Sequence, residues 1–170
     1  MPDETPVFLV DPYSDPIAVK IVGRVSFQNV VPLKEFLKDA YANGNWRFVF
    51  DFSQCTGMDS TVLGVLAGCA LELRRMKPRG SLVLSRLGAR NMELVKNLGL
   101  HRIATVDTGG EGVDDNAATA ALTGDKLSEL ENARMCLEAH ENLVEADESN
   151  RAKFQDVINY LQNRVDEADS

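Results

Sequence analysis

The sequence predicts an α/β fold in which a mixed β-sheet of four to five strands carries packed helices and is followed by a C-terminal helical extension. Two observations lead to this expectation. Strand-like and helix-like hydrophobic patterns alternate through residues 1–107, which favours parallel strand pairing in the later part. A Gly-rich acidic stretch at 108–117 reads as a flexible linker, and helical patterns alone follow at 118–170. A chain of 170 residues suits one such domain with an appendage.

Strands are expected where short runs of β-branched and aromatic residues lie between turn residues. The first two should form a hairpin, because Pro and Asp residues at 11–16 favour a turn. The predicted strands are 7–10, 17–22, 46–52, 81–85 and 102–106. Helices are expected where apolar residues recur three or four positions apart before a stop signal, and they are 31–41, 60–76 and 90–98. The first half of 60–76 is almost wholly apolar, which predicts deep burial.

The tail carries two hydrophobic stripes, which predict two helices of about 20 residues or fewer, divided near 147–149. The first stripe contains Leu127, Leu130, Leu137 and Val144, and the second contains Phe154, Val157, Ile158, Leu161 and Val165. We expect the stripes to bury against the preceding domain or against a second copy in a homodimer, because exposed apolar stripes are unfavourable. We also expect residues 1–107 to fold without the tail.

The charge distribution excludes several partner classes. The net charge is −8, and residues 118–170 hold 12 acidic and 5 basic residues, a net of −7 that leaves −1 for the rest. An acidic chain without a basic stripe is unsuited to nucleic acid.

No apolar run approaches the roughly 20 residues of a membrane span, and the first residues are acidic, unlike those of a signal peptide. We therefore expect a cytoplasmic protein that does not insert into membranes.

Metal, disulfide and cofactor sites are not expected. Cys55, Cys69 and Cys136 are widely spaced and odd in number, which indicates reduced and mostly buried thiols. His101 and His140 lack companion ligands at metal-binding spacing, so surface or packing roles are expected. No glycine-rich phosphate-binding motif is present, and the sequence offers no recognisable His partner for a nucleophilic serine. An enzyme is therefore not expected.

The informative segment is 51–66, where a strand ends, a loop containing Gly57 follows, and Asp59-Ser60-Thr61 stands at the predicted start of the next helix. The first turn of a helix has unpaired N–H groups and partial positive charge, so it stabilises an anion. A phosphoryl group on Ser60 would suit this position. Asp, Ser and Thr are also the residues preferred for plain N-caps, so a purely structural role stays open.

This segment resembles the signature of STAS domains, in which a strand ending in Asp leads to Asp-Ser-Ser/Thr-Gly-Leu-Gly at a helix start. The matching positions are Asp51, Asp59, Ser60, Thr61, Leu63 and Gly64. Segments 19–25, 79–84 and 93–103 are similar to other parts of the family pattern, so the resemblance covers roughly 7–107. It implies a bacterial STAS domain of the anti-sigma factor antagonist type, with Ser60 as the phosphorylation site and Thr61 as the alternative.

The resemblance further implies a non-enzymatic switch in signal transduction and transcription regulation. The unphosphorylated form would bind an anti-sigma factor or a GHKL-type serine kinase, and a phosphatase would reverse the modification. The implied partner-binding residues are Ser26, Gly57, Met58, Asp59, Ser60, Thr61 and Val62. Two of them depart from the family pattern, since Val62 replaces a Gly and Ser26 replaces a loop Asp. The alternatives are an unphosphorylated scaffold or transporter-associated STAS domain and, from another class, a small nucleotide-binding protein or enzyme.

Overall fold

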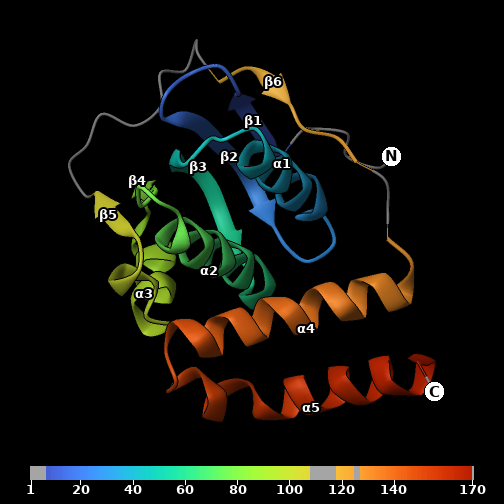
Figure 1. The fold of residues 1–170 in the computed structure, drawn as a ribbon. Helices are drawn as coiled ribbons and strands as arrows, with labels where there is room; N and C mark the ends of the chain where they lie inside the picture. The colour runs from blue at the N-terminus through green and yellow to red at the C-terminus, as the bar shows by residue number, and fades with distance from the viewer. Residues whose placement is uncertain (1–6, 108–117, 125–126, 170) are drawn as a thin grey trace.

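A computed structural model of the chain describes residues 7–107, 118–124 and 127–169. The described strands form one sheet in the order β5-β4-β3-β2-β1-β6 (Figure 1). Their bounds are β1 Phe8–Asp11, β2 Ile17–Val25, β3 Arg47–Met58, β4 Ser81–Ser85, β5 Thr105–Asp107 and β6 Ala120–Ala121. The helices are α1 Val31–Ala42, α2 Ser60–Arg75, α3 Ala89–Asn97, α4 Glu129–Ala146 and α5 Asn150–Asp169, with a 3₁₀ turn, η1, at Leu100–Arg102.

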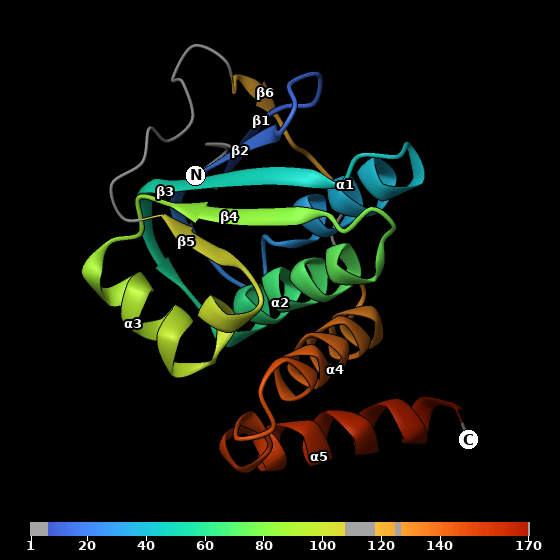
Figure 2. The same cartoon turned by 60° about the vertical axis from the view of Figure 1, so that its left-hand side comes forward.

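The sheet is mixed, as predicted. β1 and β2 pair antiparallel and form the expected hairpin, whereas β2, β3, β4 and β5 pair in parallel. Residues 118–170 were expected to be helical, but Ala120 and Ala121 form a sixth strand, β6, which pairs antiparallel with β1. Figure 2 shows α2 against the sheet, α4 beyond α2, and α5 beyond α4. The predicted α/β sheet with a C-terminal helical extension is therefore confirmed.

The core lies between the sheet and α1 and α2. Phe48, Phe50 and Phe52 alternate along β3, which places their side chains on one face of the sheet, and all three are buried. Leu33 from α1 and Leu66 from α2 pack in the same cluster. The first half of α2 is buried on nearly all sides because the sheet covers one side and α4 covers another. This explains its almost continuous apolar sequence.

Three strand boundaries differ from the sequence prediction by three residues or more. Residues 53–58 were expected in a loop, yet β3 continues to Met58. The longer β2 supplies its pairing partner through Val25, with register irregularities on the way. Residues 102–104 were expected in the last strand, but Arg102 ends the 3₁₀ turn η1 and β5 begins only at Thr105. Gly99 opens that turn with φ +80, a conformation that glycine adopts without strain.

α4 packs directly on α2 at two glycines. A Cβ atom added to Gly64 would lie 2.2 Å from the carbonyl oxygen of Ala139, so only a glycine permits this approach of the two backbones. A Cβ atom at Gly68 would lie 2.5 Å from Asn142 Nδ2. The first tail helix therefore packs on the domain, which is one of the two positions expected for the tail, but a different side of the helix makes the contact.

The face of α4 that meets α2 is not the stripe that the sequence indicated. Met135 and Leu143 of α4 join the main core. Leu137 of the predicted stripe faces the other way and packs with Ala133 and Val165 in the cluster between α4 and α5. The α2-facing side escaped detection because it carries small and polar residues, among them Ala139, His140 and Asn142. The predicted division of the two helices near 147–149 is confirmed.

The prediction that the domain folds without the tail helices can be tested with a chain ending at Gly124, which retains β6. We expect a cooperative thermal transition at a lower temperature than in the full chain. Met135 and Leu143 would be lost from the core, and a fully buried side chain of this size contributes about 1.5–3 kcal/mol. Circular dichroism of both chains measures the two transitions. A shortened chain that is insoluble or melts without cooperativity would make α4 part of the folding unit.

Candidate functional site

The start of α2 is fixed by Asp59, which is its N-cap residue. One carboxylate oxygen accepts a hydrogen bond from the Val62 N–H at 3.0 Å, and the other accepts from the Phe27 N–H at 2.9 Å. The first bond satisfies an amide of the first helical turn, and the second ties the loop after β2 to the helix. The capping role that the sequence left open for the neighbouring hydroxyls is therefore filled by Asp59.

Ser60 is the first residue of α2, and its hydroxyl binds a residue of α4. Ser60 Oγ lies 2.8 Å from His140 Nε2, and His140 Nδ1 lies 2.7 Å from the carbonyl oxygen of Cys136. A carbonyl can only accept, so the Nδ1 of His140 carries the proton. In the neutral ring Nε2 is then an acceptor, and Ser60 donates to it.

His140 is buried, and its ring packs edge-to-face on Phe154 of α5 at 5.1 Å between centroids. The expected packing role is therefore accompanied by a contact that the sequence did not reveal. The inference that Ser60 has no His partner is wrong for this conformation. The two residues are 80 positions apart, and only the packing of α4 on α2 brings them together. Hydrophobic periodicity gave no signal for this contact, because Leu137, one turn before His140, packs on the opposite side toward α5.

Thr61, the alternative phosphorylation site, is buried beneath α4 with 4% of its surface exposed. Its hydroxyl donates to the Cys136 sulfur at 3.6 Å. Burial raises the pKa of the Cys136 thiol, which keeps it protonated at neutral pH. Ser60 is only partly buried, so Ser60 is the more accessible of the two hydroxyls.

The remaining predicted partner-binding residues separate into surface and core. Ser26 and Gly57 are partly exposed near the start of α2. Phe27, which follows Ser26 and was not predicted to bind a partner, is 40% exposed. Val62 has no exposed surface and Met58 is also buried. Their side chains therefore lie in the core in this conformation. The prediction that Met58 and Val62 contact a partner directly is wrong here, and both residues instead pack beneath the start of α2.

Asp51, the strand aspartate of the STAS pattern, is fully buried and pairs with Arg86. Its carboxylate also accepts a hydrogen bond from the Ser53 N–H at 2.8 Å. Burial by itself raises the pKa of Asp51, but the Ser53 amide and the Arg86 guanidinium outweigh it and hold the pKa below its usual value. Arg86 adopts a left-handed backbone with φ 56, which is uncommon for a residue with a side chain. The pair joins β3 to the end of β4.

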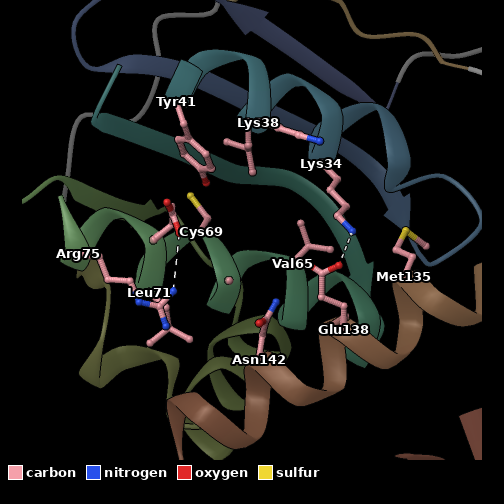
Figure 3. Close-up of a pocket in the computed structure, with 14 residues that line it drawn as sticks. Lys34, Lys38, Tyr41, Val65, Cys69, Leu71, Arg75, Met135, Glu138 and Asn142 are labelled. Atoms are coloured by element: carbon pink, nitrogen blue, oxygen red, sulfur yellow. Dashed lines mark hydrogen bonds and ion pairs between the residues drawn. The ribbon is translucent and has the colours of Figure 1, made fainter. Parts of the chain in front are cut away.

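A groove of about 360 Å³ separates α1, α2 and α4 (Figure 3). Tyr41 and Cys69 line it, and burial raises the pKa of Cys69 to about 12. Lys34 of α1 pairs with Glu138 of α4 at 3.1 Å across the groove. Ser60 and His140 are not among the groove-lining residues. The groove marks incomplete contact between α4 and the domain.

No group of His, Cys, Asp and Glu suited to a metal ion occurs among the described residues. In the same part of the chain, none of the helices has the length and apolar character needed to cross a membrane.

Comparison with known proteins identifies the family. The STAS_2 family model, described as Mlab, STAS domain, matches residues 9–107. The chain belongs to the STAS domain family. Two solved structures share its fold, each at 17% identity and a TM-score of 0.50. One is the anti-sigma factor antagonist SpoIIAA in its unphosphorylated form, with coverage of 61% of this chain and 89% of that one. The other is the Bacillus cell fate determinant SpoIIAA in the phosphorylated form, with coverage of 60% and 92%. No curated protein matched the sequence.

The depressed pKa of Asp51 predicts how stability depends on pH. A carboxyl group whose pKa is lower in the folded state stabilises the fold above its unfolded pKa, and this contribution is lost as the pH falls through the folded value. Asp51→Asn should therefore be less stable than the native chain at pH 7, by about 1–3 kcal/mol for a lost hydrogen bond to a charged group. The difference should shrink as the pH falls below about 4, the unfolded pKa of Asp.

Urea unfolding at a series of pH values measures this difference. Asp39→Asn, on the exposed side of α1, is the matched control and should change the free energy of unfolding by no more than about 0.5 kcal/mol. A difference between Asp51→Asn and the native chain that stays constant from pH 7 to pH 3 would show that the carboxylate charge contributes nothing.

Proposed function

We propose that this STAS domain is a phosphorylation-controlled protein-interaction switch, an anti-sigma factor antagonist. In its unphosphorylated form it binds an anti-sigma factor or GHKL-type serine kinase. The observation that carries the proposal is the position of Ser60, the first residue of α2 and the residue directly after the Asp59 cap. Because Asp59 caps the helix, the Ser60 hydroxyl is not needed as a cap. Ser60 can therefore be modified without loss of the N-cap hydrogen bond.

The chemistry of this position favours a reversible phosphate. The Ser60 Oγ would form a bond to the γ-phosphorus of ATP, the bond to the β,γ-bridging oxygen would break, and ADP would leave. The hydroxyl proton passes to a base of the kinase. The partial positive charge of the helix start stabilises the added group. A phosphatase restores the hydroxyl by hydrolysis.

The same phosphate would oppose partner binding. It adds roughly −1.5 to −2 of charge at pH 7, one residue from the Asp59 carboxylate. A partner docking on Ser26, Phe27, Gly57 and Asp59 would have to desolvate both negative groups, which costs binding free energy. The similarity to SpoIIAA, a protein solved in both unphosphorylated and phosphorylated forms, supports this reading at the level of the fold.

Two alternatives rest on the contact between Ser60 and His140. A scaffold STAS domain that is never phosphorylated is favoured by the occupied hydroxyl. An enzyme is favoured because a serine hydrogen-bonded to a histidine provides a nucleophile and a base, which are two of the three groups of a catalytic triad. Against the enzyme, the group that orients His140 is a backbone carbonyl instead of a carboxylate, and the groove of Figure 3 does not include Ser60.

Labelled ATP, given first alone and then with the cognate kinase, separates the three functions. We expect label only with the kinase, mapped by mass spectrometry to Ser60 and lost in Ser60→Ala. The variant should remain folded, since even a lost cap costs only about 0.5–2 kcal/mol. Asp39→Asn provides the control and should be labelled like the native chain. Label at Thr61 would move the switch by one residue; no label would favour the scaffold; label or turnover with ATP alone would favour the enzyme.

A further inference from the structure

α4 lies over the proposed switch. It provides His140, which binds the Ser60 hydroxyl, and Cys136, whose sulfur accepts from Thr61. One turn further along α2, the backbone of Ala139 lies against Gly64. The first two turns of α2 are thus covered by the tail. A kinase must bring ATP and a base to the Ser60 Oγ, and the atom already in hydrogen-bond contact with that oxygen belongs to α4.

The turn after α4 is held to the domain by the buried Asn150, which donates to the Leu98 carbonyl oxygen at 2.9 Å. The contacts of α4 itself suit a helix that can leave. Its ion pairs to the domain, Lys34 with Glu138 and Arg75 with Glu145, are solvent-exposed, and pairs of this kind contribute about 0–1 kcal/mol each. At the helix crossing, the contact is made by Ala139 on a glycine and not by large side chains. The groove of Figure 3 leaves a further part of the α1–α2 surface uncovered. Met135 and Leu143 supply the main apolar anchorage.

We propose that α4 competes in cis with a partner for the face of α2 that carries Ser60, Gly64 and Gly68, and that Ser60 is open to a kinase or partner only after α4 has left. This inference rests on the proposed function, because it concerns access to the same site. The seated α4 also indicates what the face accepts. Gly64 and Gly68 form a shallow surface flanked by Lys34 and Arg75, which fits an acidic helix with a small residue at the crossing point.

A reversible lock tests the requirement for displacement. A Cβ atom at Gly68 would lie 3.2 Å from Asn142 Cγ, so cysteines at these two positions are within reach of a disulfide. The variant with Gly68→Cys and Asn142→Cys is given to the cognate kinase with ATP, once oxidised and once reduced. We expect phosphorylation of Ser60 to be at least about tenfold slower in the oxidised form, as for a site reached only by local opening. Equal rates in the two forms would overturn the inference while leaving the proposed function intact.

A second experiment needs no kinase. Ser60→Cys is alkylated with N-ethylmaleimide, and peptide mapping separates position 60 from the native cysteines. Adding Ala139→Leu should expel α4, because the larger side chain has no room beside the Gly64 backbone, and should raise the alkylation rate at position 60 by about tenfold or more. Ala152→Leu, on the exposed side of α5, is the matched control and should not change the rate. Equal rates in all three chains would overturn the masking by α4.

A synthetic peptide of residues 127–146 tests the kind of partner. Added to the chain with Ser60→Cys and Ala139→Leu, it should restore protection of position 60. The same peptide with Glu138→Lys and Glu145→Lys should protect about tenfold less, because it places like charges opposite Lys34 and Arg75. Equal protection by the two peptides, or none by either, would contradict a face suited to an acidic helix. If the native chain is never phosphorylated, the proposed function fails while these alkylation results still decide the masking.

Discussion

The two hydrogen bonds of the Asp59 carboxylate determine the arrangement of the site. By accepting from Val62 and Phe27, this one side chain starts α2 at Ser60 and holds the loop after β2 beside it. It also relieves Ser60 of the capping role that a serine at a helix start commonly has. A hydroxyl at a positive helix end, next to a carboxylate and not needed for the cap, is suited to carry a removable charge. The STAS pattern of Asp followed by Ser thus has a physical reason in this chain.

The second constraint is the close approach of α4 to α2. Gly64 belongs to the STAS pattern, and here its missing side chain admits the backbone of Ala139. The missing side chain at Gly64 leaves the surface of α2 accessible to a partner. For the same reason, α4 of the protein's own tail can occupy that surface. His140 then extends the contact to Ser60, and Phe154 of α5 supports the His140 ring from behind. Both tail helices contribute to covering the site, although only α4 contacts Ser60.

The fold was predictable from local patterns, whereas the cover of the site was not. The alternation of apolar periods located the hairpin and α1, and the run Asp59-Ser60-Thr61 placed the start of α2 correctly. The polar run 53–58 does not have the hydrophobic alternation of a strand, so the continuation of β3 could be seen only once its pairing with β2 was known. The contact of Ser60 with His140 depends on which face of α4 turns inward. That face carries small and polar residues, so hydrophobic periodicity selected the face that meets α5 instead.

The coupling between the charge on Ser60 and the position of α4 is most directly measured by amide hydrogen exchange. The full chain can be prepared with phosphoserine incorporated at position 60 during synthesis, so that no kinase is needed, and compared with the unmodified chain. We expect faster exchange in α4 of the phosphorylated chain, with unchanged exchange in β2, β3 and β4. Exchange in α4 that is unchanged or slower after phosphorylation would contradict it, because the phosphate would then be compatible with the seated helix or would hold it more firmly.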